Sequence, residues 1–196
     1  MARSREAGSA APNQPQTRAR SASVSDAQEG GLAVSDYVLS LIPIDQEYVP
    51  SSAAREKAAA LLQEMLPDGE MCEAKVYDQL HFIDQGEYCE AVFCPSCGRR
   101  FEIDYFTEND PGLTWWLEMS EAIPKDGSIE DVQTTMPCCG AGLPFTSLEF
   151  DWPAGFAHFA LSIWNSNVAD GLLTVAQLGM LEEALGCKLK QIRAHY

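Results

Sequence analysis

The chain has 196 residues, and the hydrophobic share of 46% is enough for the core of one domain. Twenty-nine acidic residues against 13 lysines and arginines give a net charge of −16, which argues against nucleic-acid binding, because affinity for phosphates depends on basic side chains. The sequence shows neither an apolar run long enough to span a membrane nor the apolar segment of a secretory signal. We therefore expect a cytoplasmic protein that makes no membrane contact and whose paired cysteines hold metal.

Residues 1–33 differ in composition from the rest of the chain. They are rich in Ala, Ser, Gln, Gly and Arg, and they contain too few large apolar residues to offset the entropy lost on ordering. We predict a disordered tail here and a single domain over residues 34–196. A transit peptide, which its three acidic residues oppose, and a wrongly assigned start ahead of "VSDYVLS" are alternatives. The tail carries four arginines and three acidic residues, a net charge of +1. Residues 34–196 therefore carry a net charge of −17, and the two together give the total of −16.

The first half of the domain predicts strands separated by one helix. "YVLSLIPI" (37–44) is apolar almost throughout, which is typical of a strand buried on both faces. In "SSAAREKAAALLQEM" (51–65) apolar residues recur at helical spacing, and Pro67 ends that helix. Alternating patterns predict further strands at 72–84, 88–93 and 101–106.

The second half predicts three helices and further short strands. Asp110 and Pro111 begin a helix with a capping residue followed by proline. An apolar stripe predicts a second helix over 151–164, and a capping box predicts a third between Thr174 and Gly186. Short strands are predicted at 132–136, 146–150 and 187–196. This order indicates an α/β (α+β) fold, with a small mixed or antiparallel sheet backed by helices.

Two short segments, "FCPSCGRRF" (93–101) and "TTMPCCGAG" (134–142), contain four of the seven cysteines. Zinc prefers four soft ligands, which small domains supply from two short turns. Cys94 and Cys97 match the knuckle pattern C-P-x-C-G, between two predicted strands. Cys138 and Cys139 are adjacent, so both can bind one metal only if the backbone turns sharply between them, as the flanking proline and glycine permit.

These segments resemble zinc-ribbon proteins over residues 93–101 and 136–141. The resemblance implies a structural Zn²⁺ bound by Cys94, Cys97, Cys138 and Cys139, within a knuckle region spanning 88–150. Either Cys89 or His81 could replace one of the two adjacent cysteines.

Two arginines, Arg99 and Arg100, follow the first cysteine pair directly. We expect their charge to offset the double negative charge of a zinc ion bound by four thiolates. A redox-active pair is the weaker interpretation. Such a pair is usually placed at a helix N-terminus, which lowers the pKa of one thiol, whereas the segment that follows here alternates like a strand.

The remaining reactive or aromatic residues have structural interpretations. Lone cysteines such as Cys72 and Cys187 are most often small buried hydrophobes. His158 falls in the predicted helix 151–164, at the edge of the core. The tryptophans and phenylalanines around Trp115 and Trp152 could line a cleft, but we favour a role in core packing.

These features lead to one main functional hypothesis, an acidic, zinc-stabilised binding protein (an inhibitor, immunity-like factor or adaptor) that engages a basic macromolecular partner, most simply a protein. One alternative is a zinc-ribbon accessory protein in transcription or RNA handling, which the arginines after the first turn favour. The other is an enzyme, either a thiol oxidoreductase or a zinc hydrolase with an open metal position.

Overall fold

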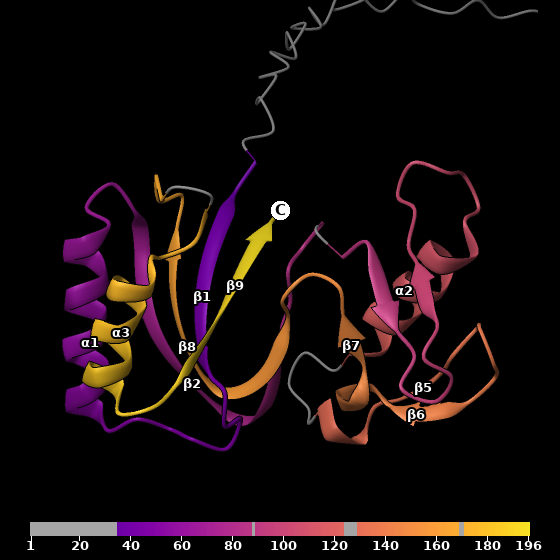
Figure 1. The fold of residues 1–196 in the computed structure, drawn as a ribbon, viewed down its shortest axis with the longest axis horizontal. Coiled ribbons are helices and arrows are strands. Elements are labelled where there is room, and N and C mark those ends of the chain that lie inside the picture. Colours follow the sequence, from indigo (N-terminus) through magenta and orange to yellow (C-terminus); the bar gives the residue numbers. More distant parts are fainter. Residues whose placement is uncertain (1–34, 88, 124–128, 169–170) are drawn as a thin grey trace, which may run out of the picture. The chain divides into compact units, whose positions relative to one another are not determined.

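A computed structural model describes residues 35–87, 89–123, 129–168 and 171–196, and the predicted tail lies outside these ranges. The described residues form three α-helices and nine strands, and every pair of neighbouring strands is antiparallel (Figure 1). The strands make three open sheets of four, three and two strands. The predicted α+β fold, with antiparallel strands backed by helices, is confirmed.

The four-stranded sheet has the order β2-β8-β1-β9. Its strands are β1 (Tyr37–Pro43), β2 (Glu70–Ile83), β8 (Gly155–Trp164) and β9 (Leu189–His195). Six of the seven β1 residues are buried, as predicted for a strand covered on both faces. Helices α1 (Ser52–Met65) and α3 (Val175–Leu185) lie side by side against one face of this sheet (Figure 1).

The capping residues predicted for α2 and α3 are present, and α1 has an N-cap as well. At α1 the Ser51 side chain accepts a hydrogen bond from the backbone N–H of Ala54, and the helix ends before Pro67. Helix α2 (Pro111–Ala122) starts with Asp110, which accepts from the N–H of Leu113. The capping box predicted for α3 is present, and Gly186 ends that helix with a φ of 78°.

The prediction of a helix over 151–164 is wrong. Residues Gly155–Trp164 form strand β8, which pairs with β1 on one side and β2 on the other. One face of β8 is buried through Ala157, Phe159, Leu161 and Ile163, and the other is mostly half-buried and carries His158 and Ser162. Because Phe156, Ala160 and Trp164 on the second face are also apolar, the alternation is incomplete and the segment also fits a helical stripe; His158 thus lies on a strand.

The other two sheets contain only short strands. Strands β3 (Ala91–Phe93), β4 (Arg100–Glu102) and β7 (Glu149–Phe150) make the three-stranded sheet, and β5 (Gln133–Thr135) pairs with β6 (Gly142–Pro144). The strands predicted at 88–93 and 101–106 are thus shorter than expected. Two 3₁₀ turns, Ile129–Asp131 and Phe145–Ser147, precede β5 and β7, so the segment predicted as a strand at 146–150 is a strand only at its end.

A separate hydrophobic core supports these short strands. It contains Trp115 and Trp116 from α2 together with Met136 and Phe145, all largely buried. Phe82 of β2 joins it, with its ring 5.0 Å from that of Phe145. This confirms the core interpretation of the paired tryptophans, whereas Trp152 is 37% exposed and lies outside this core. Cys94 and Met136 belong to the same core, so both cysteine turns pack against it.

Candidate metal centre

The four cysteines of the two predicted turns lie together. Cys94 and Cys97 occupy the turn between β3 and β4, and Cys138 and Cys139 occupy the turn between β5 and β6. All four Sγ atoms are within 4.8 Å of one another. Cys94 Sγ is 3.7 Å from Cys139 Sγ, and Cys97 Sγ is 3.6 Å from Cys138 Sγ. Each close contact thus joins one turn to the other.

The first turn is closed by two backbone hydrogen bonds. The N–H of Gly98 donates to the carbonyl of Cys94 at 2.8 Å, and the N–H of Cys94 donates to the carbonyl of Arg99 at 2.9 Å. Gly98 has a φ of 70°, a conformation that favours glycine. The geometry of the turn therefore favours glycine directly after the second cysteine.

The second turn has the same hydrogen bonds. The N–H of Gly140 donates to the carbonyl of Met136 at 2.8 Å, and the N–H of Met136 donates to the carbonyl of Ala141 at 2.9 Å. Gly140 has a φ of 71°. The second turn is therefore a knuckle of the same backbone form as the first, although its sequence departs from the usual cysteine spacing.

This equivalence explains the adjacent cysteines. Cys139 takes the position of Cys97, whereas Met136 stands where the first turn has Cys94. Cys138, one position ahead of Cys139, brings the fourth sulfur to the cluster. The sharp bend that two adjacent ligands require is present.

The sulfur spacing fits a tetrahedral metal. A zinc ion bound at about 2.3 Å by four sulfurs would separate neighbouring sulfurs by about 3.8 Å. The two closest contacts, 3.6 and 3.7 Å, match this edge length. The other pairs lie within 4.8 Å, so a cation at the centre would need to draw them together by about 1 Å at most. The donor set and its spacing both suit zinc.

The four thiols can all ionise only if a cation binds among them. Burial opposes ionisation of Cys94, but hydrogen bonds from the N–H groups of Cys97 and Ser96 outweigh it and lower the pKa of the Cys94 thiol to about 7. Burial and the hydrogen bonds with the three neighbouring thiols raise the pKa of Cys138 to about 12. Four thiolates cannot coexist at this spacing without a positive charge among them.

The two residues considered as substitute ligands lie outside the cluster. Cys89 is fully buried in the core, and burial raises the pKa of its thiol to about 12. His81 lies on β2 with its ring stacked on that of Tyr77 at 4.2 Å, and burial lowers its pKa. In the part of the chain that the structure describes, no other group of three or more possible ligands is close enough for a metal.

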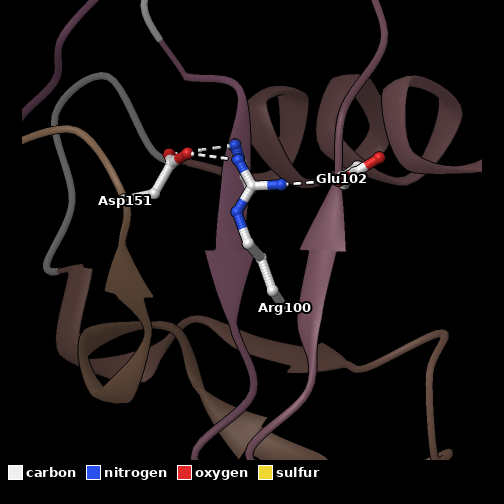
Figure 2. A network of polar contacts seen from close by, with 4 residues as sticks. Arg100, Glu102 and Asp151 are labelled. Carbon is white, nitrogen blue, oxygen red and sulfur yellow. Dashed lines mark hydrogen bonds and ion pairs between the residues drawn. The ribbon is translucent and has the colours of Figure 1, made fainter.

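The arginines after the first turn do not act together on the sulfurs. Arg100 lies between two carboxylates, donating to Asp151 at 2.8 Å and to Glu102 at 2.6 Å (Figure 2). Asp151 also accepts from the N–H of Ala91 at 3.0 Å. The Arg100 charge is thus matched by carboxylates, and the contact ties β3 and β4 to the residue that follows β7.

The cysteines outside the cluster behave as packed thiols. Cys72 is half-buried, with Sγ 3.5 Å from the carbonyl oxygen of Ala59, and Cys187 is half-buried near α3. Burial raises the pKa of both thiols. They match the expectation for small hydrophobic residues.

Comparison with protein-family models, with curated proteins and with solved structures gave no significant match. None of the helices among the described residues has the length and apolar character needed to cross a membrane. The metal-binding geometry is therefore the main guide to function.

The sequence analysis missed two features of the site. One is the equivalence of Met136 to Cys94 in the knuckle, and the other is the contact between Arg100 and Asp151. Only the first has a signal in the sequence, which is the proline and glycine that the two turns share at equivalent positions.

Proposed function

We propose that Cys94, Cys97, Cys138 and Cys139 bind one structural zinc ion in an acidic binding protein that engages a basic protein partner. The observation that supports the metal is the spacing of the four sulfurs, which approaches the edge length of a zinc–thiolate tetrahedron. When bound, the zinc ion would supply the positive charge that lets all four thiols ionise.

A structural role follows from the number of ligands. Four protein sulfurs fill a tetrahedral site, whereas catalytic zinc keeps one position open for water or substrate. The metal would also join two hairpins with strands of only three residues each, and isolated hairpins are marginally stable at best. The zinc hydrolase hypothesis lacks the open position that its chemistry needs.

The thiol oxidoreductase hypothesis also has little support from the surroundings of the first turn. A reactive C-x-x-C pair is usually placed at a helix N-terminus, which lowers the pKa of the attacking thiol. Here the turn leads directly into strand β4. The lowered pKa of Cys94 is what a metal-binding turn also produces, because its backbone N–H groups point at the sulfur.

The partner is proposed from charge. Residues 34–196 carry −17, and a field of that sign speeds the approach of basic proteins and repels phosphate backbones. The RNA or DNA accessory hypothesis needs a basic patch at Arg99 and Arg100, but Arg100 already pairs with two carboxylates. Too few free cations remain there for tight binding to nucleic acid.

The metal is tested by elemental analysis of the purified protein and by cobalt substitution. We expect about one zinc per chain and, with cobalt, the charge-transfer bands of tetrahedral thiolate coordination. A fully folded protein without metal would contradict the proposal. The partner is tested by measuring binding to basic proteins and to nucleic acid over a range of salt concentrations, with association to the protein expected to slow as salt rises.

A further inference from the structure

Two hollows on the surface of the described residues meet at Glu87 and Tyr105, which line both. The first has a volume of about 660 Å³ and lies between the end of β2, helix α2 and Tyr196. The second has a volume of about 810 Å³ and lies beside β4 and the turn that contains Phe106. We call the two together the acidic groove.

The lining of the acidic groove is strongly negative. It contains five carboxylates, which belong to Asp84, Glu87, Glu90, Glu102 and Asp104. Arg100 is the single lysine or arginine among the lining residues, so four negative charges remain in excess. That arginine is already engaged by Glu102 and by Asp151 (Figure 2).

Two of these carboxylates maintain the shape of the groove. Asp84 accepts from the N–H of Gly86 at 2.7 Å and from the hydroxyl of Tyr196 at 2.9 Å. Asp104 accepts from the N–H of Phe106 at 2.8 Å and from the hydroxyl of Thr107 at 2.5 Å. The side chains of Glu87 and Glu90 are exposed and remain available for a ligand, although Glu87 also lies 3.3 Å from a ring nitrogen of His195.

Aromatic side chains accompany the carboxylates. Tyr105, Trp116 and Tyr196 line the first hollow, and Phe106 lines the second. Phe106 is 99% exposed although the turn that carries it is held by hydrogen bonds to the Asp104 carboxylate. Aromatic faces attract cations and pack against the aliphatic part of basic side chains, and an exposed aromatic on a fixed turn is suited to anchor a partner.

Burial and nearby carboxylates both act on the tyrosine hydroxyls of the first hollow. Burial raises the pKa of Tyr196, and the carboxylate of Asp84 raises it further. Burial also raises the pKa of Tyr105, with smaller contributions from Cys89, Glu87 and Asp84. A phenol resists ionisation when negative charge is close, so the field of the carboxylates extends into the first hollow.

We propose that the acidic groove binds an arginine-rich segment of a partner protein. The planar guanidinium group forms paired hydrogen bonds with carboxylates and stacks on aromatic rings, so arginine matches both components of the lining better than lysine does. The inference rests on the proposed function, because it gives the basic partner a docking surface.

The test measures binding of a fluorescein-labelled nona-arginine peptide to the full-length, zinc-loaded protein by fluorescence anisotropy at low salt. The groove variant is Glu87→Gln with Glu90→Gln. The matched control is Glu64→Gln with Glu183→Gln, which makes the same change in net charge at exposed positions on α1 and α3, helices that line neither hollow. We expect about a tenfold loss of affinity for the groove variant and less than about twofold for the control.

Phe106→Ala provides a second variant, which should weaken binding by about two- to fivefold with no loss of thermal stability, because the ring makes almost no contact with the fold. Nona-lysine should bind more weakly than nona-arginine. Equal losses for the groove and control pairs, or equal affinity for the two peptides, would overturn the groove assignment while the proposed function stands. A wild-type protein that binds neither peptide would overturn both the groove assignment and the proposal of a basic partner, while the zinc proposal keeps its own test.

Discussion

Replacement of Cys94, a buried ligand in our proposal, by serine tests whether a bound metal supports the fold, and the chain offers a matched control in Cys89. The two thiols are 1% and 0% exposed and belong to the same hydrophobic core. Cys94 belongs to the four-sulfur cluster, whereas Cys89 does not. A difference between Cys94→Ser and Cys89→Ser therefore reports the metal and not the burial of a hydroxyl.

The expected magnitudes follow from this difference. A serine hydroxyl buried in place of either thiol costs about 1–3 kcal/mol. Cys94→Ser also loses the stabilisation that bound zinc provides, about 4 kcal/mol when zinc is present at a thousand times its Kd. In a domain of this size 1 kcal/mol changes the Tm by about 2–4 °C, so we expect Cys94→Ser to lower it by at least about 10 °C and Cys89→Ser by clearly less.

The assay is thermal unfolding of each protein with added zinc and again with a metal chelator. Wild type and Cys89→Ser should lose similar stability on chelation, because both keep the four sulfurs. Cys94→Ser should respond little to the chelator and should contain less zinc as purified. If Cys94→Ser retains one zinc per chain and the wild-type response to chelation, the assignment of this ligand is refuted.

Three further predictions concern pH, the tail and nucleic acid. Zinc binding at pH 7 should release protons, because the pKa of Cys138 is about 12 without a cation. Zinc affinity should also fall as the pH falls through 7, the pKa of Cys94. Calorimetry in two buffers measures the proton release, and its repetition over a range of pH measures the affinity; an affinity independent of pH would contradict thiolate ligation. Deletion of residues 1–33 should leave the Tm and zinc content unchanged, as their composition predicts, and a large loss of stability would refute this. Arg99→Glu should scarcely change binding to RNA or DNA, which we expect to be weak; it is a cleaner test than reversal of Arg100, which would also break the contact with Asp151.

The sequence predicted well those elements whose ends are set by local chemistry. Helices α1, α2 and α3 begin at side chains that bond to their own first turn, and such residues can be recognised without knowledge of the rest of the fold. Strand β8 was missed because its pairing with β1 and β2, and the burial of one face against α1 and α3, depend on segments that are distant in sequence. The arginine of β4 was assigned to the metal for the same reason, since Asp151 reaches it from 51 residues away.

The site itself was predictable as far as its four cysteines, but not the way in which the second pair is arranged. In a regular knuckle the backbone of the first cysteine closes the turn and its side chain supplies a sulfur. In the second turn Met136 keeps the backbone role, while Cys138 brings the sulfur from a position that is Ser96 in the first turn. The turn geometry is therefore set by the proline, the glycine and the backbone, and the position of the ligand can vary within it.

This separation leads to a prediction that moves a ligand. Cys138→Ser alone should weaken zinc binding, because three sulfurs remain in the cluster. Adding Met136→Cys would restore the regular spacing, because Met136 has the backbone hydrogen bonds and the burial of Cys94, whose sulfur reaches the cluster from the equivalent position. The smaller side chain leaves a cavity that costs about 1–3 kcal/mol, so the measurement must be zinc affinity by competition with a chelator and not the Tm. We expect the double variant to recover most of the affinity lost by Cys138→Ser; a double variant that binds zinc no better than the single one would show that the two turns are not equivalent as ligand carriers.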